Sequence, residues 1–277
     1  MTAGRDPSRH RDVVRESFER QAEEFSRSPV VTDASSLEAL LRWTKLGGDE
    51  RVLDVACGPG VVAAAFAPHA RFVIGVDLTP AMLRRAIEVA REKGARNTAF
   101  VLGDGERVPF ADGSFERVIS RRSFHHFPDP RAVLRDMARV CAPGGAVVIE
   151  DQAPPSDPEA AATMTAIERL RDPSHTEAVQ PDRWEGLFRD SGLRLDEIAL
   201  GSREMDVEEW MTRAHPAPAD AARARELLES VARGERPGPP VWREDGALRF
   251  RIGTQLVRGT VPSPEKVNRR PVPGATP

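Results

Sequence analysis

The segment Val52–Gly60 constrains the fold of this chain more than any other stretch. It is a short apolar run that carries an acid, Asp54, and then enters a turn containing Gly58 and Gly60. The following residues, Val61–Ala67, are rich in alanine and predict a helix. Glycine lets the backbone approach a ligand closely, and a helix N-terminus offers free N–H groups. The segment therefore predicts a strand, turn and helix that cradle a ligand.

The charge beside this turn narrows the class of ligand. Gly58, Gly60 and Ala63 also fit the dinucleotide fingerprint G-x-G-x-x-G/A, which leaves a nicotinamide-dependent oxidoreductase as an alternative. However, Asp54 would repel an anionic pyrophosphate. The chain contains no tyrosine, which excludes the Tyr-Lys chemistry of short-chain dehydrogenases. S-adenosylmethionine carries a sulfonium and an ammonium group and no phosphate, so it suits Asp54 better.

The same segment resembles the first motif of class I S-adenosylmethionine-dependent methyltransferases. The resemblance implies that the cofactor lies against Asp54, Ala56, Cys57, Gly58 and Gly60. It also implies that further motifs follow in a fixed order downstream. Burial rather than reactivity is the expected state of the Cys57 thiol.

The second motif of the resemblance falls at Asp77, directly after the apolar run Arg71–Val76. In the family, an acid here accepts hydrogen bonds from both ribose hydroxyls, a task that suits the two oxygens of a carboxylate. The resemblance places Leu78 and Met82 beside the adenine. The alternative for Asp77 is a helix-capping role before Pro80.

The third motif is Gly103-Asp104-Gly105, which resembles the family's Gly-Asp-Ala segment. The resemblance implies that Asp104 accepts a hydrogen bond from the adenine amino group and that Gly103 and Gly105 border the ring. Glycine in place of alanine at position 105 is a mild departure from the pattern.

The fourth motif lies in Ser120–Pro130, which resembles the His-His-Phe-x-Asp-Pro segment of the type 11 and ubiquinone/menaquinone-biosynthesis-like methyltransferases. Ser120 and Arg121 are expected to meet the methionine end of the cofactor. His125 is the first candidate for a general base and His126 the second, because histidine accepts a proton near neutral pH. The alternative is that these rings pack or hold the loop. No further cluster is spaced to complete a metal site.

Strands alternate with helices along the chain, which predicts a sheet with helices on both faces. The resemblance implies a Rossmann-like, doubly wound α/β sheet of seven strands, mostly parallel with an antiparallel last strand. The predicted strands are Arg51–Val55, Arg71–Val76, Thr98–Leu102, Phe115–Ser120, Ala146–Glu150, Leu193–Leu200 and Ala247–Thr260.

The chain divides into three predicted regions. Residues 1–46 predict N-terminal helices, which either form a lid over the cofactor or simply pack on the domain; the resemblance implies that Phe25 touches the cofactor. Residues 47–261 form the methyltransferase domain, with a helical insertion at about 203–235 before the last strand. Residues 262–277 are rich in proline and predict a disordered tail.

Composition excludes several classes of function. A net charge of −3 and the lack of a basic stripe argue against nucleic acid as a partner. No apolar run is long enough to span a membrane, and residues 1–11 are too polar for a secretory signal, so a cytoplasmic location is expected. The two cysteines give no disulfide framework, and a homodimer is left open.

The predicted function is transfer of a methyl group from S-adenosylmethionine to O, N or C of a small-molecule acceptor, such as a quinone, a lipid-like molecule or a secondary metabolite. The alternative within the same fold is a non-methylating S-adenosylmethionine-binding protein, either a cyclase or a structural subunit.

Overall fold

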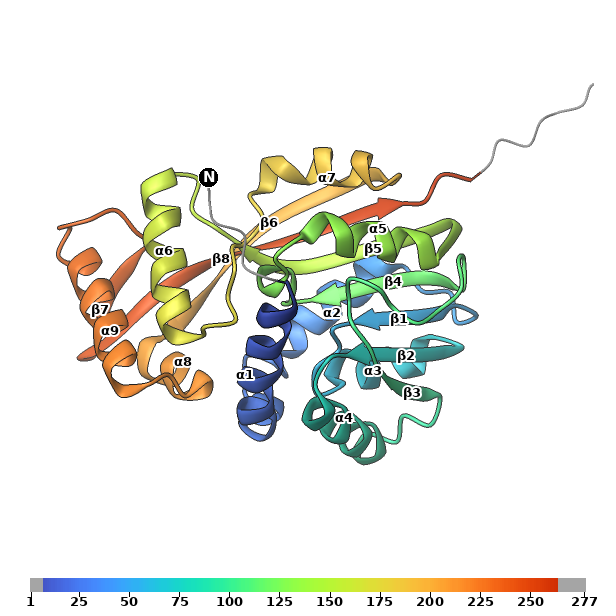
Figure 1. Cartoon of the computed structure of the whole chain (residues 1–277), viewed down its shortest axis with the longest axis horizontal. Coiled ribbons are helices and arrows are strands. Elements are labelled where there is room, and N and C mark those ends of the chain that lie inside the picture. Colours follow the sequence, from blue (N-terminus) through green and yellow to red (C-terminus); the bar gives the residue numbers. More distant parts are fainter. Residues whose placement is uncertain (1–6, 264–277) are drawn as a thin grey trace, which may run out of the picture.

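The computed structural model describes residues 7–263 and contains a central eight-stranded sheet (Figure 1). The strand order is β3-β2-β1-β4-β5-β8-β6, and β7 pairs with β8 beside this path. The strands are β1 (Arg51–Val55), β2 (Phe72–Asp77), β3 (Thr98–Leu102), β4 (Phe115–Arg121), β5 (Cys141–Ala153), β6 (Arg194–Asp206), β7 (Val241–Glu244) and β8 (Ala247–Thr260).

Strands β1 to β5 are parallel, whereas β8 pairs antiparallel with both β5 and β6. This arrangement confirms the predicted fold class, including the antiparallel last strand of the main path. The short strand β7 was not predicted. It forms a hairpin with β8 through a turn at Asp245 and Gly246, which both have positive φ. The reversal of strand order between β1 and β4 creates the crevice in which open α/β sheets bind ligands.

Helices cover both faces of the sheet. The helices are α1 (Pro7–Arg27), α2 (Ala34–Thr44), α3 (Val61–Phe66), α4 (Pro80–Glu92), α5 (Pro130–Val140), α6 (Pro158–Arg171), α7 (Trp184–Asp190), α8 (Val207–Ala214) and α9 (Pro218–Ala232). Short 3-10 turns occur at η1 (Ala67–His69), η2 (Phe124–His126) and η3 (Pro181–Arg183).

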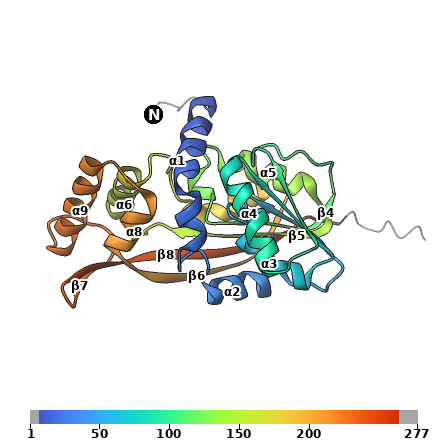
Figure 2. The same cartoon turned by 90° about the horizontal axis from the view of Figure 1, so that it is seen from below.

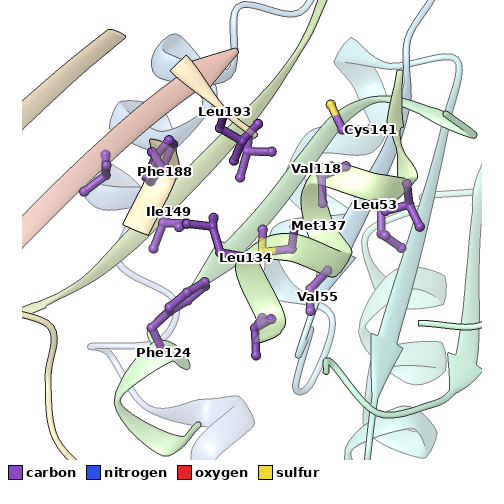
Figure 3. Close-up of a cluster of buried hydrophobic side chains, with 14 of the residues drawn as sticks. Leu53, Val55, Val118, Phe124, Leu134, Met137, Cys141, Ile149, Phe188 and Leu193 are labelled. Carbon is purple, nitrogen blue, oxygen red and sulfur yellow. The ribbon is translucent and has the colours of Figure 1, made fainter. Parts of the chain in front are cut away.

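Successive side chains of each buried strand point alternately into two hydrophobic cores, because the side-chain repeat of a strand is two residues. Leu53 of β1 packs with α5 and α7 residues such as Leu134 and Phe188 (Figure 3), whereas its neighbour Val52 packs with Leu40 and other residues of α2 and α3. Because both faces are buried, the strands read as continuous apolar runs rather than alternating ones.

Strands β6 and β8 extend beyond the sheet's parallel part and carry a third hydrophobic core. Met205 and Phe250 lie on these extensions and pack against Trp210 of α8, Leu228 of α9 and Ile167 of α6. Strand β6 was predicted to end at Leu200 but continues to Asp206, so the start of the predicted insertion is strand rather than helix.

Helix α1 lies between the two parts of the molecule (Figures 1 and 2). It packs against α4 on one side and α8 on the other. Its position places residues of the N-terminal segment over the crevice at the ends of β1 and β4. The predicted tail lies, from residue 264 onward, outside the described residues.

Candidate active site

A cavity lies at the carboxyl ends of β1 to β4, beneath helix α1. It brings together most of the residues that the resemblance assigned to the cofactor. Those that line it are Phe25, Asp54, Ala56, Cys57, Gly58, Asp77, Leu78, Met82, Gly103, Asp104, Gly105 and Arg121, and the second candidate base, His126, lines it as well.

Two of the predicted cofactor residues do not line this cavity. Gly60 lies behind the turn, where it is the N-cap of α3 and packs against Ala86. Ser120 is fully buried, and its hydroxyl donates to the carbonyl oxygen of Val55 at 2.8 Å and lies 2.5 Å from the Ser123 hydroxyl. Both residues therefore lie behind the residues that line the cavity and hold those residues in place.

The carboxylate of Asp54 is buried and unpaired. Its side chain is 1% exposed, and neither oxygen has a hydrogen-bond partner among the described residues. Burial raises the pKa of Asp54 to about 8, opposed by the charge of Arg121 and reinforced by that of Asp77. Leaving a buried acceptor unsatisfied costs about 1–3 kcal/mol, so the site is built for a donor or cation that the protein does not supply. The ammonium and sulfonium groups of S-adenosylmethionine fit this requirement.

Asp77 links the end of β2 to the glycine turn. One carboxylate oxygen accepts the Gly58 N–H at 2.8 Å, and the other accepts the Thr79 N–H at 2.9 Å. Burial raises the pKa of Asp77, although these backbone donors oppose the rise. Each oxygen keeps a second acceptor position, so Asp77 can hold the turn and also receive hydroxyl donors from a ligand. Asp77 is not the N-cap of α4, because Thr79 occupies that position, although the Asp77 carboxylate accepts the backbone N–H of Thr79.

The turn between β1 and α3 leaves open space where a ligand would lie. A Cβ added at Gly58 meets nothing within 4 Å, and Gly58 has a φ of +52°. The neighbouring residue Ala56 also has positive φ, which is uncommon for a residue with a side chain. Strained backbone of this kind concentrates at functional sites.

Asp104 connects the loop after β3 to helix α1. Its carboxylate accepts a hydrogen bond from Arg11 at 3.1 Å, and Arg11 also lies 3.6 Å from Glu106. Asp104 further accepts the backbone N–H of Glu106 at 2.9 Å, which fixes the loop. Asp104, which the resemblance implies accepts a hydrogen bond from the adenine amino group, is therefore linked through Arg11 to the helix that covers the cavity.

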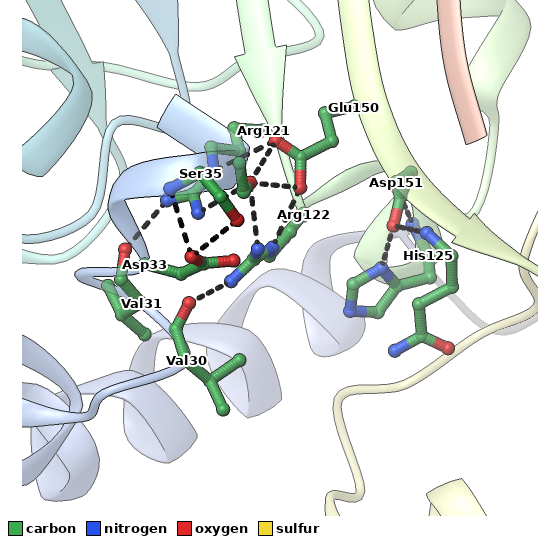
Figure 4. A network of polar contacts seen from close by, with 11 residues as sticks. Val30, Val31, Asp33, Ser35, Arg121, Arg122, His125, Glu150 and Asp151 are labelled. Carbon is green, nitrogen blue, oxygen red and sulfur yellow. Dashed lines mark hydrogen bonds and ion pairs between the residues drawn. The ribbon is translucent and has the colours of Figure 1, made fainter. Parts of the chain in front are cut away.

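Arg121 and Arg122 close the other end of the cavity (Figure 4). Both guanidinium groups pair with Glu150 of β5, at 3.0 and 3.1 Å, and both donate to the loop between α1 and α2, Arg121 to the Val31 carbonyl oxygen and Arg122 to that of Val30. Arg121 lines the cavity, but its hydrogen bonds hold this loop in place. Its contribution toward the cavity is the positive charge that it presents to Asp54.

A second cavity adjoins the first on the side of β6 and α8. The two share five lining residues, which therefore form the boundary between them. These residues are Phe18, Phe25, Val31, Arg122 and His126. His125 lines the second cavity and not the first.

His125 forms a buried pair with Asp151 of β5 (Figure 4). Its Nδ1 lies 2.5 Å from one carboxylate oxygen, and its backbone N–H donates to the other at 3.1 Å. Burial alone would lower the pKa of His125, but the charge and hydrogen bond of Asp151 raise it. This pairing fixes the ring and leaves Nε2 as the atom able to exchange a proton.

His126 has the opposite character. Burial and the neighbouring charge of His125 lower the pKa of His126 to about 3, so the ring is neutral. Its Nδ1 lies 3.0 Å from the Ser174 hydroxyl, and its ring packs edge-on against Phe18. His126 therefore forms part of the wall between the cavities.

Three functional residues were not singled out from the sequence. Asp151 follows β5 residues that read as core, and His10 and Arg11 lie in a helix whose polar face predicts solvent contact. His10 is 3% exposed, and its Nε2 lies 2.8 Å from the His126 carbonyl oxygen. Its Nδ1 is buried without a partner among the described residues. Only long-range packing brings these side chains to the cavity.

The Cys57 thiol lines the cofactor cavity without being a reactive group. Burial raises the pKa of the Cys57 thiol well above its usual value, so the thiol stays protonated. Residues 7–263 contain no group of three or more His, Cys, Asp or Glu side chains placed to hold a metal ion. Over the same residues, no helix is long and apolar enough to cross a membrane.

Comparison with known proteins also points to a methyltransferase. Residues 53–149 match a methyltransferase domain family model of type 11. The uncharacterized methyltransferase YcgJ of Bacillus subtilis is 32% identical over 203 residues, which span 73% of this chain and 80% of YcgJ.

Solved structures agree with this relationship. A putative methyltransferase from Bacillus halodurans superposes with a TM-score of 0.77 at 29% identity and covers 83% of this chain and all of that protein. Geranyl diphosphate C-methyltransferase from Streptomyces coelicolor, solved with S-adenosyl-L-homocysteine, shares the fold at a TM-score of 0.57 and 16% identity, covering 82% of this chain and 79% of that protein.

S-adenosylmethionine is the cofactor that fits the open turn at Gly58 and the acids at Asp54, Asp77 and Asp104. These relatives indicate the same cofactor. This chain belongs to the class I S-adenosylmethionine-dependent methyltransferases.

Proposed function

We propose that this protein transfers the methyl group of S-adenosylmethionine to a small-molecule acceptor held in the second cavity, with His125 as general base. The observation that carries the proposal is the position of the buried His125–Asp151 pair in a cavity that shares a wall with the cofactor cavity. An acceptor in the second cavity would reach the cofactor where the two cavities adjoin, at Phe18, Phe25 and His126, and these side chains would move aside so that its nucleophilic atom contacts the methyl group.

The cofactor supplies a methyl group already activated by a sulfonium, so the protein's main tasks are positioning and exclusion of water. Asp54 would receive the cationic end of the cofactor, and its raised pKa would fall as that charge arrives. Asp77 would receive the ribose hydroxyls, and Asp104 the adenine amino group. Leu78 and Met82 would supply the apolar walls beside the ring.

His125 would remove a proton from the acceptor's nucleophilic atom. Because Asp151 accepts from Nδ1, the neutral ring presents its Nε2 lone pair, and Asp151 stabilises the imidazolium that forms. An acceptor with an acidic proton, such as a phenol, needs this base less than an aliphatic alcohol does.

The N-terminal residues 1–46 would act as the lid. Phe18 and Phe25 of α1 pack edge-on at 5.8 Å and both line the boundary between the cavities. Entry of either ligand would require this helix to move, and its return would exclude water from the transferring methyl group.

The test is formation of S-adenosylhomocysteine from S-adenosylmethionine in the presence of phenolic, hydroxylated lipid and amine acceptors. We expect acceptor-dependent turnover with at least one class, reduced about 100-fold in His125→Ala. Binding of the cofactor without acceptor-dependent turnover across all three classes would contradict methyl transfer and favour a non-methylating role.

A further inference from the structure

The second cavity is rich in arginine. Four guanidinium groups from four different elements line it, which are those of Arg122, Arg171, Arg203 and Arg213. Three of them have a carboxylate partner within 4.0 Å. The three pairs are Arg122–Glu150 at 3.1 Å, Arg171–Glu168 at 3.6 Å and Arg213–Glu209 at 3.2 Å.

Arg203 of β6 differs from the other three. Its side chain makes no ion pair and no hydrogen bond within residues 7–263, and its Nε is buried without a partner. It lies two residues before Met205 on the same strand, so both side chains point to one face of the sheet, and both line the cavity.

An uncompensated guanidinium beside other guanidinium groups is electrostatically unfavourable. Burial lowers the pKa of Arg203, and it lowers the pKa of Arg122 to about 9 and that of Arg213 to about 10, with the charges of neighbouring arginines adding to the effect. Asp172 is the carboxylate among the lining residues, and its oxygens accept hydrogen bonds from Ser17, Gln21 and Ser174 rather than from Arg203. Glu150, Glu168 and Glu209 each lie within 4.0 Å of another arginine, so no carboxylate of the described residues pairs with Arg203, and its charge is left for a ligand.

Part of the cavity wall is apolar or aromatic. Phe18, Trp210, Met205 and Ile252 line it, and the guanidinium of Arg171 stacks over the Trp210 ring at 4.5 Å from its centre. This combination suits a ligand with a flat or apolar body and one anionic group.

We propose that the methyl acceptor carries a carboxylate, which binds Arg203 while the rest of the acceptor lies against the aromatic wall. This inference rests on the proposed function and specifies its substrate class. A single carboxylate neutralises the single unpaired guanidinium, and its two oxygens match the planar, bidentate geometry of arginine. Because Arg203 and the boundary residue His126 line the same cavity, an acceptor anchored by its carboxylate can extend its other end toward the cofactor.

The test uses three probes of equal ring size: benzoate, benzamide and phenyl phosphate. Each is titrated by ligand-observed NMR into the full-length protein saturated with S-adenosylhomocysteine. For the wild type we expect benzoate to bind at least about tenfold more tightly than benzamide, which is about 1.4 kcal/mol. Benzoate should also bind more tightly than phenyl phosphate, whose second charge has no partner.

Variants separate the role of Arg203 from general charge. Arg203→Gln should reduce the preference for benzoate over benzamide to less than about threefold, whereas Arg203→Lys should keep part of it. The matched control is Arg243→Gln, because Arg243 of β7 is exposed and lies outside the cavity. Thermal unfolding of each variant checks that it is folded.

The outcomes are distinct. Equal binding of benzoate and benzamide to the wild type, tighter binding of phenyl phosphate, or an unchanged preference in folded Arg203→Gln would each overturn the proposal. Failure of the underlying function is recognised separately, because the wild type would then form no S-adenosylhomocysteine from S-adenosylmethionine with any acceptor, whatever its affinity for benzoate.

Discussion

His125 and Asp151 lie in direct contact, with Nδ1 of the imidazole 2.5 Å from a carboxylate oxygen in a site that excludes solvent. The charge of Asp151 raises the pKa of His125 against the effect of burial. A general base works only when it is neutral. We therefore expect kcat/KM to fall on the acid side with an apparent pKa above the ordinary histidine value of about 6.5.

Replacing Asp151 with asparagine tests this relationship. Asp151→Asn removes the charge and should move the acid limb of the pH profile to lower pH, with a loss in kcat of about 100-fold or more. Other groups around His125 are Glu168 and Asp172, which favour its charged form, and the rings of His126 and His175. An acid limb that stays in place after Asp151→Asn would show that Asp151 does not tune the base.

Asp54 is expected to cost stability in the protein without cofactor. Its folded-state pKa of about 8 lies above the ordinary aspartate value of 3.8, so the folded state binds its proton more tightly than the unfolded state. Stability should therefore decrease as pH rises from 3.8 to about 8 and then level off. Asp54→Asn should remove this slope and raise the free energy of unfolding near pH 8 by about 1–3 kcal/mol.

The same substitution should weaken cofactor binding about tenfold or more, because the neutral amide no longer attracts the cofactor's cationic groups. Chemical denaturation of the free protein between pH 5 and 8, with calorimetry on S-adenosylhomocysteine, measures both effects. Destabilisation of Asp54→Asn at pH 8 would contradict an unpaired buried carboxylate.

The two glycines of the turn are expected to respond differently to alanine. A Cβ at Gly60 would lie 2.7 Å from the Cβ of Ala86, so Gly60→Ala should destabilise the fold, by about 2–4 kcal/mol once backbone strain is included. A Cβ at Gly58 meets no protein atom within 4 Å and should cost only about 1 kcal/mol of backbone strain. Gly58→Ala should instead reduce cofactor affinity, since the methyl group enters the cradle. Thermal unfolding and calorimetry separate the two effects, and equal loss of stability in both variants would contradict this assignment.

The ion pair between Arg11 and Asp104 should slow cofactor release. The pair is partly exposed, so its contribution is no more than about 1 kcal/mol, which corresponds to about fivefold in rate. We expect Arg11→Ala to increase the dissociation rate of S-adenosylhomocysteine by two- to fivefold in stopped-flow displacement. Arg15→Ala is the matched control, because Arg15 pairs with Asp12 on the same helix and lies outside the cofactor cavity. An equal effect in both variants would indicate a general effect on α1.

The fold and the cofactor half of the site could be predicted because they depend on local patterns. A strand that ends in an acid and a glycine turn, as at Asp54 and Gly58, fixes its own geometry over a few residues. The order of parallel strands then brings Asp77 and Asp104 to the same edge of the sheet. The position of Asp77 and Asp104 directly after their strands is sufficient to predict where they lie in the fold.

The acceptor half depends on long-range packing and could not be predicted in the same way. Asp151 reaches His125 only because β5 continues past its predicted end, and Arg203 lies on a part of β6 expected to be helical. Helix α1 places His10 and Arg11 over the cavity by packing between α4 and α8. No short-range pattern in the sequence reports such contacts.

Asp77 holds the glycine turn and is the residue expected to join it to the cofactor, so its substitution tests cofactor binding most directly. Calorimetric titration with S-adenosylhomocysteine should show micromolar affinity for the wild type and a loss of about 100-fold, or about 2.7 kcal/mol, in Asp77→Ala. Asp112→Ala is the control, because Asp112 is exposed and lies outside both cavities. Unchanged affinity in Asp77→Ala, or no binding to the wild type together with binding of NADH, would contradict the account.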